Sequence, residues 1–207
     1  MTLHDYIYQH IVPQYDNFDA AHQRNHVLSV IDRSMQLATH YPEVDKRIVL
    51  VAAACHDLGL CGDRKVHHLT SGRMIRADEH LRQWFSEDEI ETIACAAEDH
   101  RASSTHAPRS LYGMIVAEAD RLIDPETVLL RTVQYGLSHY PDMTREEQYK
   151  RMRDHVVEKY GEQGYMHLWL PESPNAAPLE ELRQIISHED VLRQIFNRCY
   201  ARVHTEA

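Results

Sequence analysis

The sequence predicts an all-α protein, and three observations lead to this prediction. The 207 residues include only seven glycines. No segment alternates regularly between apolar and polar side chains, as a half-buried strand would. Apolar residues instead recur at helical spacing along almost the whole chain. We therefore expect a helical fold with no extended sheet.

The apolar spacing predicts a series of helices separated by polar or Pro- and Gly-containing segments. In chain order they cover residues 24–40, 45–59, 68–84, 87–99, 110–123, 126–138, 144–160 and 178–202. Two of these helices begin with a capping box, in which Ser or Thr is followed three residues later by Glu. The pairs are Ser86 with Glu89 and Thr144 with Glu147. The longest break, residues 161–178, is rich in Gly and Pro and is expected to be an ordered loop.

The length of the chain fits one domain. A chain of this size can bury roughly 70% of the surface that its unfolded form exposes. No internal repeat, low-complexity tract or linker marks a boundary within the sequence. We therefore expect a single domain over residues 1–207.

Charge and cysteine usage argue against several classes of protein. The formal net charge of -10 disfavours long nucleic acid as a partner, because such binding needs clustered Lys and Arg. No uncharged apolar segment approaches the roughly 18 residues that span a bilayer. The four cysteines form no CxxC pair, and residues 1–6 lack the basic start of a secretory signal. We expect a cytoplasmic protein without a membrane partner, and the sequence makes no prediction of the oligomeric state.

The adjacent residues His56 and Asp57 end the apolar run Ile48–Cys55, in which nothing requires a charge. A buried, unpaired carboxylate costs several kcal/mol, so it must meet a cation or lose its charge. Taken by itself, the pair could be explained without a metal, with His56 hydrogen-bonded to a carbonyl and Asp57 paired with an Arg. Asp120, however, lies on the apolar stripe of its own helix, and an ion shared with Asp57 explains both carboxylates. Together with His26, these residues predict a metal site with imidazole and carboxylate ligands.

These four residues, in this order, resemble the pattern that gives its name to the HD-domain superfamily of metal-dependent phosphohydrolases. The neighbouring sequences Asn25-His26-Val27, Ala54–Gly59 and Glu118–Leu122 are also similar to the corresponding family segments. The resemblance covers roughly residues 20–124. It implies a helical metal-binding core there, followed by a helical extension over about residues 125–207.

Some branches of the superfamily hold a second metal with two further histidines. The candidates here are His68, which precedes Ser71-Gly72 at the spacing of an H-x-x-S-A/G motif, and His100, which closes a helix. By spacing alone, each could be a helix-end residue that interacts with the helix dipole. The resemblance implies one or two divalent ions, drawn from Mn, Fe, Co, Ni, Mg or Zn. The implied ligands are His26, His56, Asp57, His68, His100 and Asp120.

The resemblance also implies a reaction, the hydrolysis of a small phosphorylated compound, with a nucleotide as the first candidate. A metal-activated hydroxide would be the nucleophile, and Asp57 would be the catalytic residue that bridges the ions and orients it. Lys65, Arg101 and Arg109 are candidates for binding the substrate phosphate, although each could be a solvated surface charge. Two alternatives are an HD-type di-iron oxygenase and a regulatory module that binds a nucleotide without hydrolysing it.

Overall fold

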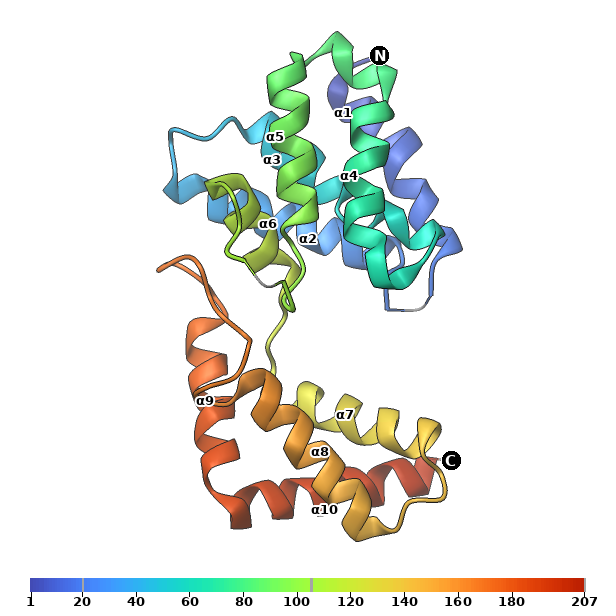
Figure 1. Cartoon of the computed structure of the whole chain (residues 1–207), viewed down its shortest axis with the longest axis vertical. Coiled ribbons are helices and arrows are strands. Elements are labelled where there is room, and N and C mark those ends of the chain that lie inside the picture. Colours follow the sequence, from blue (N-terminus) through green and yellow to red (C-terminus); the bar gives the residue numbers. More distant parts are fainter. Residues whose placement is uncertain (20, 105, 207) are drawn as a thin grey trace. The chain divides into compact units, whose positions relative to one another are not determined.

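The computed structural model describes residues 1–19, 21–104 and 106–206, and across them it has ten α-helices and no strand (Figure 1). The all-α prediction is therefore confirmed. The chain divides into two compact units, Met1–Arg121 with Trp169–Ser173, and Leu122–Leu168 with Pro174–Ala207. This division lies close to the expected end of the core near residue 124, while the single-domain organisation stays a prediction. Within the described residues, no helix has the length and apolar character needed to cross a membrane.

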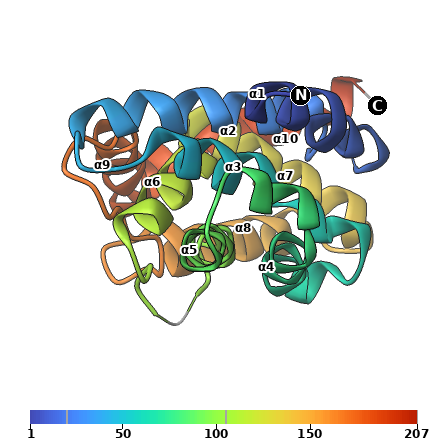
Figure 2. The same ribbon diagram turned by 90° about the horizontal axis from the view of Figure 1, so that it is seen from above.

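The first unit is built around a central apolar helix, α3 (Lys46–Cys55). Nearly every residue from Ile48 to Cys55 is buried, because α2, α5 and α6 all pack against this helix. Helices α4 and α5 also pack side by side, and Figure 2 looks along both of them. The other helices of the unit are α1 (Leu3–Tyr6), α2 (Arg24–Leu37), α4 (His67–Ala77), α5 (Glu87–Glu98) and α6 (Leu111–Asp120).

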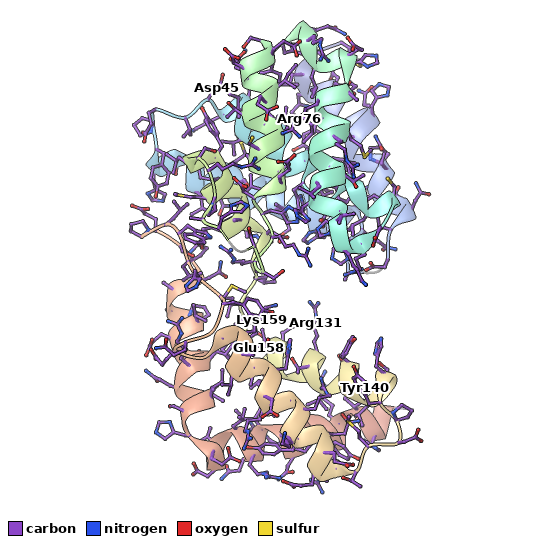
Figure 3. All side chains as sticks on the ribbon, viewed as in Figure 1. Asp45, Arg76, Arg131, Tyr140, Glu158 and Lys159 are labelled. Carbon is purple, nitrogen blue, oxygen red and sulfur yellow. The ribbon has the colours of Figure 1, made fainter. Side chains whose placement is uncertain are left out.

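Side-chain caps determine where several helices begin. Asp45 accepts a hydrogen bond from the Arg47 amide at the start of α3, and Figure 3 labels this aspartate. The predicted capping box of Ser86 with Glu89 is confirmed at the start of α5, where both of its hydrogen bonds form. The predicted box at Thr144 is likewise confirmed at the start of α8 (Arg145–Tyr160). These helices begin where their caps satisfy the first unpaired amides.

The helices of the first unit differ from the sequence prediction in two places. Residues 3–17 are helical throughout, as α1 followed by a π-helix (Ile7–Ile11) and a 3-10 helix (Val12–Asn17), and no helix was predicted there. Three hydrogen-bond periods in fifteen residues produce no single apolar spacing. The helix expected over residues 68–84 ends at Ala77, where Asp78 accepts a hydrogen bond from the His80 amide and a 3-10 turn follows.

The loop before α9 contributes residues Trp169–Ser173 to the first unit. The Trp169 amide and the Ser173 hydroxyl both donate hydrogen bonds to the carboxylate of Glu118, which is fully buried in α6. Arg121 lies 3.3 Å from the same carboxylate. Two of these three partners belong to the loop, so their hydrogen bonds to the buried carboxylate attach the loop to α6.

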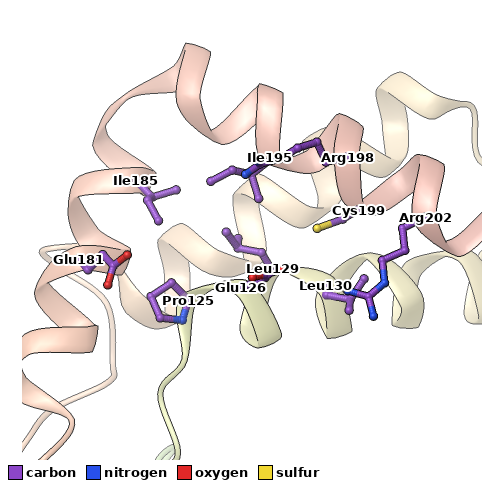
Figure 4. Close-up of a pocket in the computed structure, with 10 residues that line it drawn as sticks. All are labelled: Pro125, Glu126, Leu129, Leu130, Glu181, Ile185, Ile195, Arg198, Cys199 and Arg202. Atoms are coloured by element: carbon purple, nitrogen blue, oxygen red, sulfur yellow. The ribbon is translucent and has the colours of Figure 1, made fainter.

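The second unit contains α7 (Pro125–His139), α8, α9 (Ala176–Ser187) and α10 (Glu189–Glu206). The prediction of one helix over residues 178–202 was wrong, because the chain leaves the helical conformation at His188. The acidic residues Glu189 and Asp190 follow at the start of α10, where the helix dipole favours negative charge. A cavity of about 330 Å³ in this unit is lined by residues of α7, α9 and α10 (Figure 4).

Candidate metal centre

Six side chains of the first unit converge on one point, and we call them the central cluster. Each lies within one turn of a helix end, where side chains from several helices can meet. The helices that supply them are α2, α3, α4, α5 and α6, with one side chain each except for two at the end of α3. In chain order, the members of the central cluster are His26, His56, Asp57, His67, His100 and Asp120.

One half of the cluster is formed by His26, His56 and Asp120 around one oxygen of Asp57. The Nε2 atom of His26 lies 3.2 Å from Nε2 of His56, 3.3 Å from Oδ1 of Asp120 and 3.5 Å from Oδ2 of Asp57. The Nε2 atom of His56 lies 3.2 Å from Oδ2 of Asp57 and 3.6 Å from Oδ1 of Asp120. These four side chains therefore surround one small volume with nitrogen and oxygen donors.

The other half is formed by His67 and His100 around the second oxygen of Asp57. The two Nε2 atoms are 3.1 Å apart. The Oδ1 atom of Asp57 lies 3.3 Å from Nε2 of His67 and 3.4 Å from Nε2 of His100. Potential ligand atoms of His26, His56 and Asp57, and those of Asp57, His67 and His100, lie within 4.8 Å of one another in each group. Asp57 is the one residue common to both groups.

Backbone carbonyls determine which ring nitrogen of three histidines faces the cluster. Nδ1 lies 2.7 Å from the Ala53 carbonyl in His56, 2.7 Å from the Arg64 carbonyl in His67, and 2.6 Å from the Ala97 carbonyl in His100. A carbonyl oxygen can only accept, so we assign the proton of each neutral ring to Nδ1. The Nε2 lone pairs then point into the cluster, as in histidines that bind a metal.

Burial disfavours charge in the cluster, but the neighbouring opposite charges outweigh this effect. Asp120 and Asp57 accept hydrogen bonds from His26 and so raise its pKa, and the same carboxylates raise the pKa of His56 well above its usual value. The histidines in turn hold the pKa of Asp57 and Asp120 well below the usual range. Without a cation, protons must therefore balance the two carboxylates. A divalent ion would replace those protons, and the mixed imidazole and carboxylate donor set fits such an ion.

The cluster is buried on one side and partly open on the other. The side chain of His56 is fully buried, and those of Asp57 and His100 are nearly so. The side chains of His26 and Asp120 are 21% and 26% exposed. A molecule in solution would therefore reach the cluster past His26 and Asp120.

Five of the six residues expected as ligands come together, and His68 does not. The imidazole beside His100 belongs to His67. His67 precedes Ser71 by one helical turn, and Ser71 Oγ accepts a hydrogen bond from the Gly59 amide, just after the His-Asp pair. His68 precedes Gly72 by one turn, on the side of α4 that packs closely against α5. The structure therefore brings His67, in place of the expected His68, to the cluster.

His68 lies instead in a neighbouring cavity of about 320 Å³, which it lines with residues that include Glu98, Asp99 and Arg109. Burial, followed by the nearby His100 and Arg101, lowers the pKa of His68 to about 4. Its imidazole is therefore neutral near pH 7. The adjacent histidines of α4 thus have different surroundings, one in the cluster and one in this cavity.

The three basic residues expected to bind phosphate have different surroundings. Arg101 donates a hydrogen bond of 2.7 Å from Nη1 to the carbonyl of Lys65, which lies in the 3-10 helix Arg64–Val66. Lys65 itself is exposed. Arg109 forms ion pairs with Glu98 at 2.7 Å and with Asp99 at 2.9 Å. Its charge is therefore already balanced by two carboxylates.

Comparison with known proteins identifies a family to which part of this chain is similar. The family model described as HD domain matches residues 24–123, a range that contains the whole central cluster. No curated protein and no solved structure gives a significant match.

Proposed function

Residues 24–123 form an HD domain, and from this premise we propose that the protein is a metal-dependent phosphohydrolase for a small phosphorylated compound. The HD domain suggests a superfamily of metal-dependent hydrolases, and this supports the proposal. Within that class, we propose a nucleotide as the first substrate to test. A net charge of -10 disfavours a nucleic-acid polymer, whereas a small phosphate ester needs only the metal centre and a few basic side chains.

The observation that carries this proposal is the position of Asp57 between two groups of imidazoles. One carboxylate oxygen lies beside His26 and His56, and the other lies beside His67 and His100. Each group offers at least three donors, which is enough to hold one divalent ion while leaving positions for substrate. A structural ion pair would need only one cation for this carboxylate, and here four imidazoles surround it.

We propose that Asp57 contributes to the binding of two ions. His26, His56 and Asp120 would complete one site, and His67 and His100 would complete the other. Mn, Fe, Co, Ni, Mg and Zn are the candidate metals. Divalent ions in such sites lower the pKa of a bound water and neutralise charge on a phosphoryl group.

The protein's own residues then have separate tasks. His26 and Asp120 lie at the open edge of the cluster, where the substrate would enter. Arg101 is hydrogen-bonded to the Lys65 backbone, and we propose that the two side chains bind the phosphate. We rank Arg109 behind them, because Glu98 and Asp99 already neutralise its guanidinium. The four cysteines are free, in keeping with the cytoplasmic location that we also propose.

A screen of phosphate release tests the proposal. Purified protein of measured metal content would be incubated with nucleoside mono-, di- and triphosphates, cyclic nucleotides and sugar phosphates, in the presence of Mn, Co, Ni, Mg or Fe. We expect metal-dependent release from at least one nucleotide, and its loss in Asp57→Asn. The absence of release from any of these compounds, by protein shown to carry metal, would contradict the proposed function.

A further inference from the structure

The turn that carries His56 and Asp57 is held by a side chain from a distant part of the chain. Tyr15 lies on the 3-10 helix Val12–Asn17, before the HD match begins at residue 24. Its side chain is fully buried. Its hydroxyl donates a hydrogen bond of 2.9 Å to the Ala54 carbonyl and accepts one of 3.2 Å from the Asp57 amide. A single oxygen atom thus contacts the backbone on both sides of the turn.

This hydroxyl is placed where the backbone leaves the helix. Helix α3 ends at Cys55, and Asp57 has left the helical conformation, with φ of -108° and ψ of 6°. The last carbonyls of a helix have no partner within it and need other donors. The Ala53 carbonyl accepts from Nδ1 of His56, and the Ala54 carbonyl accepts from Tyr15. The backbone around both cluster residues is therefore held by these two side-chain donors.

We propose that Tyr15 is a positioning residue for the metal centre, which fixes the Asp57 backbone so that its carboxylate lies between the two groups of histidines. Asp57 has few rotatable bonds between its amide and its carboxylate, so a shift of the amide moves both oxygens. The inference rests on the proposed function only in taking the cluster to be a metal site. It extends the functional unit to the N-terminal segment, outside the residues that match the family.

The same segment supplies a matched control. Tyr6 is also buried, and its hydroxyl donates a hydrogen bond to Asp78, which is not a member of the central cluster. Tyr6→Phe and Tyr15→Phe each remove one hydrogen-bonded hydroxyl and leave the ring in place. A general loss of stability would affect both variants alike, whereas a positioning effect would appear in Tyr15→Phe alone.

Three measurements on the protein test the inference. In metal-free protein, hydrogen exchange at the Asp57 amide should become faster in Tyr15→Phe and stay unchanged in Tyr6→Phe. In calorimetric titration with Mn²⁺, we expect Tyr15→Phe to bind about tenfold more weakly, the usual order of loss when an outer partner of a metal ligand is removed. The absorption spectrum of the Co²⁺-loaded protein should change in Tyr15→Phe only.

The outcomes separate this inference from the proposed function. If wild-type protein binds no metal, both are wrong. If wild type binds Mn²⁺ and Tyr15→Phe binds it equally well, the role of Tyr15 is overturned and the metal site stands. Equal losses of affinity in the two variants would also overturn it, because they would indicate a shared effect on stability.

Discussion

The two halves of the central cluster are built in different ways. His26, His56 and Asp120 come from α2, α3 and α6, three helices that pack on one another in the core of the first unit. His67 begins α4 and His100 follows the C-terminal end of α5, and these two helix ends meet. The first half therefore depends on core packing, and the second depends on the register of two neighbouring helices. Asp57 is the one residue on which both halves depend.

The largest effect should follow from Asp57→Asn, because this change removes a ligand from both halves at once. We expect the protein to lose both ions and phosphate release to fall by on the order of 1,000-fold or more. Metal analysis of dialysed protein and the release assay would measure these losses. The exposed Asp88→Asn in the same unit is the control and should bind both ions. Retention of two ions by Asp57→Asn would show that the halves do not share this carboxylate.

A smaller effect is expected when only one half is changed. His26→Ala should remove an ion from the first half and His67→Ala from the second, so each variant should retain one ion of the two. His68→Ala is the control for the second half, and it should retain both ions with little change in affinity. Metal stoichiometry from elemental analysis would separate the three variants. Loss of an ion in His68→Ala, with none in His67→Ala, would reverse the placement of these two residues.

The difference between the halves also explains how much of the site could be predicted from sequence. A charged pair at the end of an apolar run, and an aspartate on an apolar stripe, are visible in the sequence because burial makes them costly. Asp57 and Asp120 were found in this way, and they do lie together. The choice between His67 and His68 depends instead on which side of α4 faces the end of α3. Contacts such as Ser71 with Gly59 turn His67 toward the cluster, and the spacing rule that favoured His68 does not include such contacts.

The helices, too, could be predicted only where the sequence carries a local pattern. Helices with one regular apolar period and a clear cap, such as α5 and α8, were predicted to within a residue or two. The N-terminal segment was missed, since its α, π and 3-10 turns do not share a period. The contact between Tyr15 and Asp57 joins residues 42 positions apart, and no local pattern marks it.

A pH dependence is expected from the first half when no metal is bound. The carboxylates of Asp57 and Asp120 raise the pKa of His26 and His56 in the folded protein above the ordinary value of 6.5. Each histidine therefore contributes stability that is complete below about pH 6.5 and is lost as the pH rises through its folded pKa. Thermal unfolding in EDTA between pH 6 and 9 should show a falling Tm. His26→Gln should show a smaller fall, and an equal fall in wild type and variant would contradict this account.

The smallest effect should come from the basic residues at the edge of the second half, where Arg101 and Arg109 are expected to differ. Arg101 is hydrogen-bonded to the Lys65 carbonyl beside the proposed phosphate site, so Arg101→Ala should raise KM several-fold, equivalent to about 1 kcal/mol, with kcat little changed. Arg109 pairs with Asp99, whose side chain is fully buried, so Arg109→Ala should instead lower the stability by about 1–3 kcal/mol, because that carboxylate loses its charged partner while the amide of residue 109 still donates to it. Steady-state kinetics and urea unfolding of both variants would test this contrast. A rise in KM for Arg109→Ala at unchanged stability would return Arg109 to the phosphate-binding residues, and would mean that its two carboxylates orient it for substrate.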